Sequence, residues 1–248
     1  MLEFHNLSVT YGKKAVLDGV CFALRHGKIT ALLGKNGSGK STLLSCVNRL
    51  AAYSGRITLD GKDIVAIPPR LRAREVAIFP QILPDTPFSV RELAALGRNP
   101  YVGADGRLSA ADRETVTHAL DMAGVSHLAN RAVNTLSGGE RQRAFLAMVL
   151  AQDTPSVLLD EPATFLDADA ARDLYTLVTD LSRVHQRTVL AVMHDLSAAV
   201  DVADDIVILD GGRVAFHGTA EECLASHAIE TIFSVKAHVC EDGTVFFR

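Results

Sequence analysis

The segment at residues 34–41, with the sequence GKNGSGKS, constrains what this chain can fold into more than any other feature. A short apolar run over 28–34 precedes it and is consistent with a buried strand, and apolar residues at helical spacing follow over 41–50. Its glycines allow backbone N–H groups to turn inward around phosphate oxygens, where side chains would collide. A loop of this pattern between a strand and a helix predicts a nucleotide-binding α/β protein.

Two side chains of this loop have predicted chemical roles. Lys40 is expected to reach the β- and γ-phosphates, and the Ser41 hydroxyl is expected to ligate Mg²⁺. The helix that begins near Lys40 adds its positive N-terminal dipole. The alternative is a glycine-rich turn without a ligand, but average residue frequencies give the bare pattern a chance of only about one per cent in a chain of this size.

Two carboxylates, Asp160 and Glu161, end a second apolar run at 157–159. Asp160 is placed to hold Mg²⁺ through water, as in other phosphate-loop enzymes. Glu161 has the position of a general base that polarises an attacking water. Acidic residues often end strands, so the segment alone leaves an ordinary strand end open; the upstream phosphate loop favours the functional interpretation.

The sequence LSGGE at 136–140 is a second anion-receptive terminus, in which a serine and two glycines head a predicted helix. Because one nucleotide has only one triphosphate, two such termini in one chain suggest that they are used across a dimer. As a bare pattern the same residues also fit a capped helix start, with Ser137 as the N-cap.

Strand-like and helix-like segments alternate along most of the chain, and a helical stretch interrupts them in the middle. Strands are expected over 2–10, 15–24, 55–61, 76–79, 156–159, 188–192, 206–209 and 213–217, and helices over 90–96, 109–123, 140–151, 169–184 and 196–203. Ser109 and Ser137 have the positions of N-cap residues. Gly211 and Gly212 are typical of a hairpin turn, and a short helix with one or two small strands is expected after them. This alternation implies a mainly parallel sheet covered by helices.

Composition excludes several classes of function. The net charge is −4, so no global basic field favours nucleic acid, and a solvated loop face accounts for the locally basic segment 62–74. The four cysteines are scattered without metal-ligand spacing, which fits a reducing compartment. No apolar run reaches about 18 residues, and no secretion leader is recognised, so a transport pore would have to be a different chain.

Taken in order, these motifs resemble the nucleotide-binding subunits of ABC transporters, and the resemblance covers nearly the whole chain. It implies an α/β phosphate-loop NTPase fold of the ABC ATPase type, with a RecA-like, mainly parallel core. Residues 1–83 and 153–248 would form this core and an antiparallel β subdomain. Residues 84–152 would form a helical subdomain that carries the signature motif at 136–140.

The resemblance also assigns roles residue by residue. It makes Tyr11 the aromatic that stacks on adenine, Gln81 the Q-loop residue that acts on Mg²⁺ and the attacking water, and His194 the switch histidine that contacts the γ-phosphate. Without that context they would be a strand-end aromatic, an ordinary loop glutamine and a satisfied buried histidine. The other matching positions are Gly34, Lys35, Asn36, Gly37, Ser38, Gly39, Lys40, Ser41 and Thr42 of Walker A, Ser137, Gly138, Gly139 and Glu140 of the signature, Asp160 of Walker B, the catalytic Glu161, and Asp167 of the D-loop.

The resemblance implies ATP and Mg²⁺ as cofactors and a head-to-tail pair of these chains with two ATP molecules at the interface. It further implies a polytopic membrane permease, through which this chain would be held at the cytoplasmic face of the inner membrane, and, indirectly, an extracytoplasmic substrate-binding protein. An ABC ATPase that acts on DNA or ribosomes would need a long coiled-coil insertion or a second cassette, and this sequence has neither. A module that only senses ATP would tolerate loss of Glu161 or His194, and both are retained.

Four further segments, 88–98, 151–155, 161–167 and 192–196, resemble the branch of this family that serves iron–siderophore uptake. Relatives of that branch move haem or cobalamin, which are the alternative cargoes. Ala163 departs from the pattern, since a second threonine is more usual there, but this change leaves the nucleotide chemistry intact.

Overall fold

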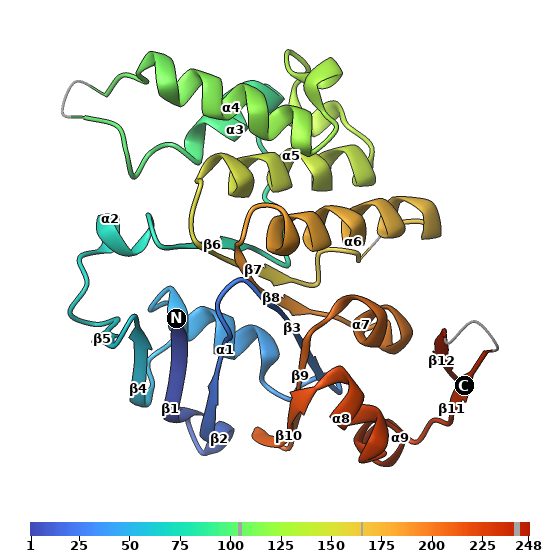
Figure 1. The fold of residues 1–248 in the computed structure, drawn as a ribbon. Coiled ribbons are helices and arrows are strands. Elements are labelled where there is room, and N and C mark those ends of the chain that lie inside the picture. Colours follow the sequence, from blue (N-terminus) through green and yellow to red (C-terminus); the bar gives the residue numbers. More distant parts are fainter. Residues whose placement is uncertain (104–105, 165, 241–243) are drawn as a thin grey trace. The chain divides into compact units, whose positions relative to one another are not determined.

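In the computed structural model the chain forms two compact units, one made of Met1–Ile67 with Val178–Arg248 and the other of Pro68–Leu177 (Figure 1). The structure describes residues 1–103, 106–164, 166–240 and 244–248. The subdomain boundaries predicted after residues 83 and 152 stay a prediction. In the described part of the chain, no helix has both the length and the apolar character needed to cross a membrane.

The first unit contains an antiparallel sheet with the strand order β2-β1-β4-β5. Its strands are β1 (Leu2–Tyr11), β2 (Lys14–Ala23), β4 (Ser54–Leu59) and β5 (Lys62–Asp63). Apolar residues alternate along β1, and the rings of Phe4 and Phe22 stack with centroids 4.5 Å apart. A half-buried strand shows this period of two, so the predicted antiparallel β subdomain is confirmed.

The first unit also holds the parallel part of the fold. β3 (Ile29–Gly34) lies between β8 (Thr188–Val192) and β9 (Asp205–Asp210) and is parallel to both. All residues of β3 and β8 are buried, as expected for central parallel strands covered on both faces. The helices α1 (Lys40–Val47) and α7 (Leu196–Val202) follow β3 and β8.

The hairpin after β9 and the end of the chain complete this unit. Gly211 and Gly212 have φ values of 55° and 81°, which confirms the predicted turn into β10 (Arg213–Thr219). The end of the chain forms α8 (Ala220–Ala225), α9 (Ala228–Phe233), β11 (Ala237–Val239) and β12 (Val245–Phe247). The prediction of a single short helix here was wrong, because His227 has a left-handed φ of 55° and divides the segment into two helices.

The second unit combines the parallel strands β6 (Val76–Phe79) and β7 (Ser156–Asp160) with a group of helices. Three of these helices, α3 (Val90–Leu96), α4 (Ala110–Met122) and α5 (Gly138–Ala151), pack on one another (Figure 1). Each begins with a serine whose hydroxyl accepts a hydrogen bond from the N3 backbone while the N3 carboxylate accepts one from the serine N–H. These capping boxes confirm the N-caps predicted at Ser109 and Ser137.

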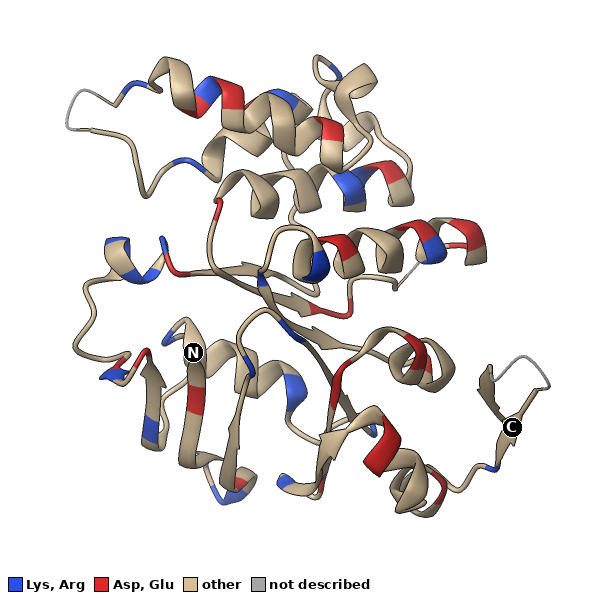
Figure 2. Ribbon diagram, in the orientation of Figure 1, with Lys and Arg blue, Asp and Glu red and all other residues tan. Residues whose placement is uncertain are grey.

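The remaining helices are short or bridge the two units in sequence. The sequence did not predict α2 (Pro69–Arg72), which Pro68 and Pro69 begin. Two 3₁₀ turns, Ser126–Leu128 and Val133–Thr135, precede α5. The unit boundary falls within α6 (Ala168–Arg183), which is strongly amphipathic: its charged residues of both signs are drawn in Figure 2, while Leu174, Val178 and Leu181 are buried.

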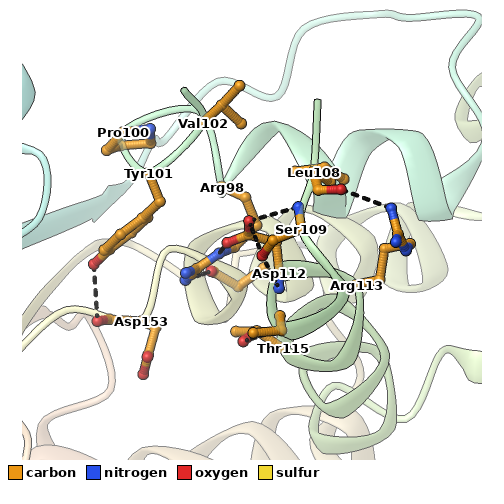
Figure 3. A network of polar contacts seen from close by, with 12 residues as sticks. Arg98, Pro100, Tyr101, Val102, Leu108, Ser109, Asp112, Arg113, Thr115 and Asp153 are labelled. Carbon is orange, nitrogen blue, oxygen red and sulfur yellow. Dashed lines mark hydrogen bonds and ion pairs between the residues drawn. The ribbon is translucent and has the colours of Figure 1, made fainter. Parts of the chain in front are cut away.

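An arginine network holds the loop that follows α3 (Figure 3). The buried Arg98 donates from Nε to Asp112 at 3.0 Å, and its guanidinium lies 3.9 Å from the centroid of the Tyr101 ring. Arg74 lies over the same ring, 4.9 Å from its centroid, and donates from Nε to the main-chain oxygen of Pro100 at 2.9 Å. Part of the basic segment 62–74 therefore supports the helical part of this unit, in addition to forming a solvated face.

The four cysteines divide into two exposed and two buried thiols, and this predicts their reactivity. Burial raises the pKa of Cys46 to about 11 and that of Cys223 to about 12, whereas Cys21 and Cys240 are exposed. At pH 8 the two buried groups stay protonated, and the thiolate is the nucleophile. We expect iodoacetamide to modify Cys46 and Cys223 more than about tenfold more slowly than the exposed pair. Peptide mapping by mass spectrometry, with and without denaturant, tests this; equal rates in the folded chain would contradict it.

Candidate functional site

The predicted phosphate loop lies between β3 and α1, and its glycines are required by the backbone. Gly34, Gly37 and Gly39 have φ values of 155°, 79° and 103°. A Cβ on Gly34 would lie 2.5 Å from Ser38 Oγ, and one on Gly39 would lie 2.5 Å from Leu17 Cδ2. Only glycine fits such positions, and a glycine-rich loop of this kind can direct backbone N–H groups toward the oxygens of a phosphate.

Two polar side chains of the loop fit an anionic ligand. The Lys40 side chain is buried, and its Nζ donates to the main-chain oxygens of Gly34 at 2.7 Å and Lys35 at 3.3 Å. Within the described part of the chain, the buried Ser38 Oγ has no hydrogen-bond partner. A buried ammonium beside an unpaired buried hydroxyl is an environment that the oxygens of a triphosphate can satisfy.

Other predicted residues of the first unit lie at the ends of its strands. β3 and β8 are parallel with Leu32 opposite Val192. Gly34 and the exposed His194, each two residues further on, therefore lie at the same edge of the sheet. Ligands of open α/β sheets bind beyond the carboxyl ends of the strands. Tyr11 ends β1 and is 56% exposed, which leaves its ring accessible.

In the second unit the structure brings Gln81 and Glu161 together. β6 and β7 are parallel with Phe79 opposite Leu159, so the residues two positions further on are neighbours. Gln81 Nε2 donates a hydrogen bond of 2.9 Å to Glu161 Oε2. Glu161 has a left-handed φ of 53°, a conformation that is uncommon for residues other than glycine and that concentrates at functional sites.

The signature residues form a capped helix start. Ser137 Oγ accepts from the Glu140 N–H at 3.4 Å, and Glu140 Oε2 accepts from the Ser137 N–H at 2.8 Å. The hydrogen bond from the Ser137 backbone holds the pKa of Glu140 below its ordinary value. A Cβ on Gly138 would meet nothing within 4 Å. The first turn of α5 is therefore capped by residues of its own chain, and there is free space at Gly138. The predicted contact of this turn with a nucleotide stays a prediction.

A cavity of about 420 Å³ lies between the predicted Q-loop, the signature helix and the segment after β7. Its lining includes Gln81, Leu83, Gly138, Arg141, Gln142 and Glu161. Three motifs that are far apart in sequence thus share one cavity of the second unit.

Sequence reasoning missed Gln142. This residue of α5 is buried, and its Nε2 donates a hydrogen bond to the main-chain oxygen of Pro162. It shares the buried stripe of α5 with Phe145, Leu146 and Val149. One amide in an otherwise apolar stripe at helical spacing is the signal that could have identified it, because buried polar groups are there to make hydrogen bonds.

The predicted Mg²⁺ ligands have suitable chemistry. The Ser41 hydroxyl, the buried Asp160 carboxylate and the Gln81 amide supply the oxygen donors that Mg²⁺ prefers, and this ion usually adds substrate phosphates and waters to one or two carboxylates. Asp167 Oδ1 accepts from the Ala170 N–H at 2.8 Å at the start of α6. Phe165, which belongs to the resemblance over 161–167, lies outside the described residues.

The phosphate loop that follows β3, the carboxylates at the end of β7 and the capped signature helix define a phosphate-loop protein of the α/β class. Residues 17–164 match the family described as ABC transporter. The chain belongs to this family and is an ATPase of the ABC type. The predicted family and fold class are thereby confirmed.

Relatives with similar sequences extend over nearly the whole chain. The ferric enterobactin transport ATP-binding protein FepC of Escherichia coli (strain K12) is 38% identical over 244 residues, which cover 97% of this chain and 90% of the relative. The hemin import ATP-binding protein HmuV of Nocardia farcinica (strain IFM 10152) is 40% identical over 232 residues, covering 92% and 79%.

Solved structures of similar fold also belong to ABC transporters. An inward-facing ABC transporter described as of the metal-chelate type has a TM-score of 0.85 at 25% identity, over 100% of this chain and 96% of that chain. The dimeric, post-hydrolysis structure of the ATP-binding cassette MJ0796 bound to ADP and Pi has a TM-score of 0.80 at 26% identity, over 89% and 99%.

Proposed function

We propose that this chain is the ATP-hydrolysing subunit of an ABC importer and that a head-to-tail pair of chains drives uptake of iron–siderophore complexes through a separate permease. The observation that supports the enzymatic part most directly is the 2.9 Å hydrogen bond between Gln81 and Glu161, beside the same cavity as Gly138. A polar group and a carboxylate held at this distance can orient and deprotonate a water that binds beside them.

Within one chain, each predicted residue has a definite task. Lys40 exchanges the loop carbonyls for β- and γ-phosphate oxygens, while Ser41 and Asp160 hold Mg²⁺. The bound ion neutralises charge on the β- and γ-phosphates. Glu161 accepts a proton from the attacking water, Gln81 orients that water, and His194 contacts the γ-phosphate from the same sheet edge as the phosphate loop.

Two chains are required because the signature serves the other chain's nucleotide. Each ATP lies between the phosphate loop of one chain and Ser137–Gly139 of the second copy, with Asp167 near the interface. The γ-phosphate bridges both copies and ADP cannot, so ATP favours the closed dimer and hydrolysis releases it. A ligand shifts an equilibrium only through such a difference in affinity between two states.

The segment after Gln81 is the proposed contact with the permease. It exposes large apolar side chains, with Ile82 81% and Phe88 44% exposed. Exposed apolar groups close together mark interaction sites. Segment 81–98, which contains α3, would pass the movement of the ATPase to the membrane at its cytoplasmic face. Substitutions in 83–88 that spare both assembly and transport-coupled ATPase activity would refute this.

The cargo is proposed from relatives. FepC is named for ferric enterobactin transport, and segments 88–98 and 161–167 resemble the iron–siderophore branch. HmuV is named for hemin import, which favours haem as the second candidate, with cobalamin as a third. An extracytoplasmic binding protein would deliver the cargo, so the ATPase need not contact it.

Co-purification with a co-expressed polytopic permease, followed by ATPase and uptake assays, tests this function. We expect the permease to stimulate ATPase activity and cells to take up ⁵⁵Fe-siderophore but not haem or cobalamin. An Ile82→Asp variant should keep ATP binding and lose the permease. ATPase activity without any permease association would refute the transport role. Uptake of haem alone would refute iron–siderophore as the cargo and assign haem instead.

A further inference from the structure

Helix α5 contains a buried amide that the reaction as proposed does not use. The Gln142 side chain is buried, and its Nε2 donates to the main-chain oxygen of Pro162. The carbonyl of Pro162 belongs to the residue that follows Glu161. Gln142 therefore joins the first turns of the signature helix to the backbone that carries the predicted general base.

The backbone at Glu161 needs such support. Its φ of 53° is left-handed, and surrounding contacts must hold a residue in that region. One contact is local, since the Thr164 N–H donates to the Glu161 carbonyl at 3.2 Å. The amide of Gln142 supplies a more distant one at the next carbonyl, that of Pro162, and it comes from a helix about 20 residues away in sequence.

A second glutamine in the same helix region shows what a structural role alone looks like. Gln152, at the C-cap of α5, donates from Nε2 to the main-chain oxygens of Ala73 at 2.6 Å and Val76 at 3.1 Å. Its chemistry matches that of Gln142. The difference is location, because Gln142 lines the cavity that Gln81 and Glu161 share, whereas Gln152 does not.

We infer that Gln142 is a positioning residue for Glu161: by holding the Pro162 carbonyl it keeps the Glu161 carboxylate directed toward Gln81 and the cavity. The inference rests on the proposed function, in which Glu161 is the base. Because α5 begins with the signature, the same amide makes the orientation of the base in one chain depend on the helix that meets the second copy's nucleotide.

A Gln142→Met variant tests this, with Gln152→Met as the matched control. Methionine keeps the length and flexibility of the side chain and removes the amide group with its N–H donor. We expect Gln142→Met to lower kcat roughly ten- to hundredfold with KM for ATP unchanged, since small misplacements of a catalytic group cost rates of this order. Gln152→Met should lose thermal stability with kcat unchanged.

The Glu161→Gln background separates positioning from general damage. Single-turnover hydrolysis of labelled ATP should be equally slow with and without Gln142→Met, because no base remains to be misplaced. Should the methionine variant fail to fold, Gln142→Asn keeps an amide that is too short to reach Pro162, and the same result is expected.

Three results would overturn the inference. A normal kcat in Gln142→Met, beside an inactive Glu161→Gln, would refute it and leave the proposed function standing. An equal further loss in the Glu161→Gln background would show a structural role only. Normal turnover by Glu161→Gln itself would refute the proposed base and this inference with it.

Discussion

A Glu161→Gln variant is expected to lower ATP turnover by about a hundredfold to ten-thousandfold while ATP binding stays intact. The substitution removes the group that takes the proton and keeps the shape of the side chain. Its amide oxygen can still accept the hydrogen bond that Gln81 Nε2 now donates to Glu161 Oε2 at 2.9 Å. Steady-state phosphate release and equilibrium binding of a fluorescent ATP analogue measure the two quantities separately.

The same variant should accumulate as a dimer in ATP, because the γ-phosphate that bridges the two copies is no longer removed. Size-exclusion chromatography in ATP and in ADP detects this dimer. Glu114→Gln is the matched control, since Glu114 is exposed on α4 and should leave turnover unchanged. Normal turnover by Glu161→Gln would remove Glu161 from the base role.

The parts of this molecule that could be predicted from sequence are those that a few neighbouring residues determine. The phosphate loop is one, because the positive φ values of Gly34 and Gly39 favour glycine and a Cβ on Gly34 would lie 2.5 Å from Ser38 Oγ of the same loop. The helix starts at Ser109 and Ser137 are others, since a capping box needs only four consecutive residues. The strand alternation of β1 likewise reports burial directly.

Features that depend on pairing between distant segments could not be predicted in the same way. The hydrogen bond from Gln81 to Glu161 follows from the register of β6 and β7, which no local pattern specifies. The bond from Gln142 to Pro162 and the left-handed φ of Glu161 depend on how α5 packs in the second unit. Sequence motifs predict which residues react, and tertiary packing determines which contacts hold those residues.

A Gly138→Asp variant is expected to lose the ATP-dependent dimer and, with it, turnover by roughly a hundredfold or more, while a single chain still binds ATP. The fold should tolerate the change, because a Cβ at Gly138 meets nothing within 4 Å. An aspartate in the first turn of α5 even stabilises the helix, because its negative charge interacts favourably with the positive end of the helix dipole. In the proposed dimer, however, its carboxylate would face the triphosphate held by the second copy, and like charges repel strongly there.

Mixing variants distinguishes a shared site from two independent ones. When Lys40→Ala chains are mixed with Gly138→Asp chains, each mixed pair has one site with both defects and one site with an intact phosphate loop and an intact signature. ATPase activity should therefore reappear in the mixture, although either variant alone is inactive. When both substitutions are placed in one chain and mixed with unmodified chains, every mixed pair loses both sites, so activity should fall. If each chain hydrolysed ATP alone, the first mixture would recover nothing and the second would only dilute the active chains.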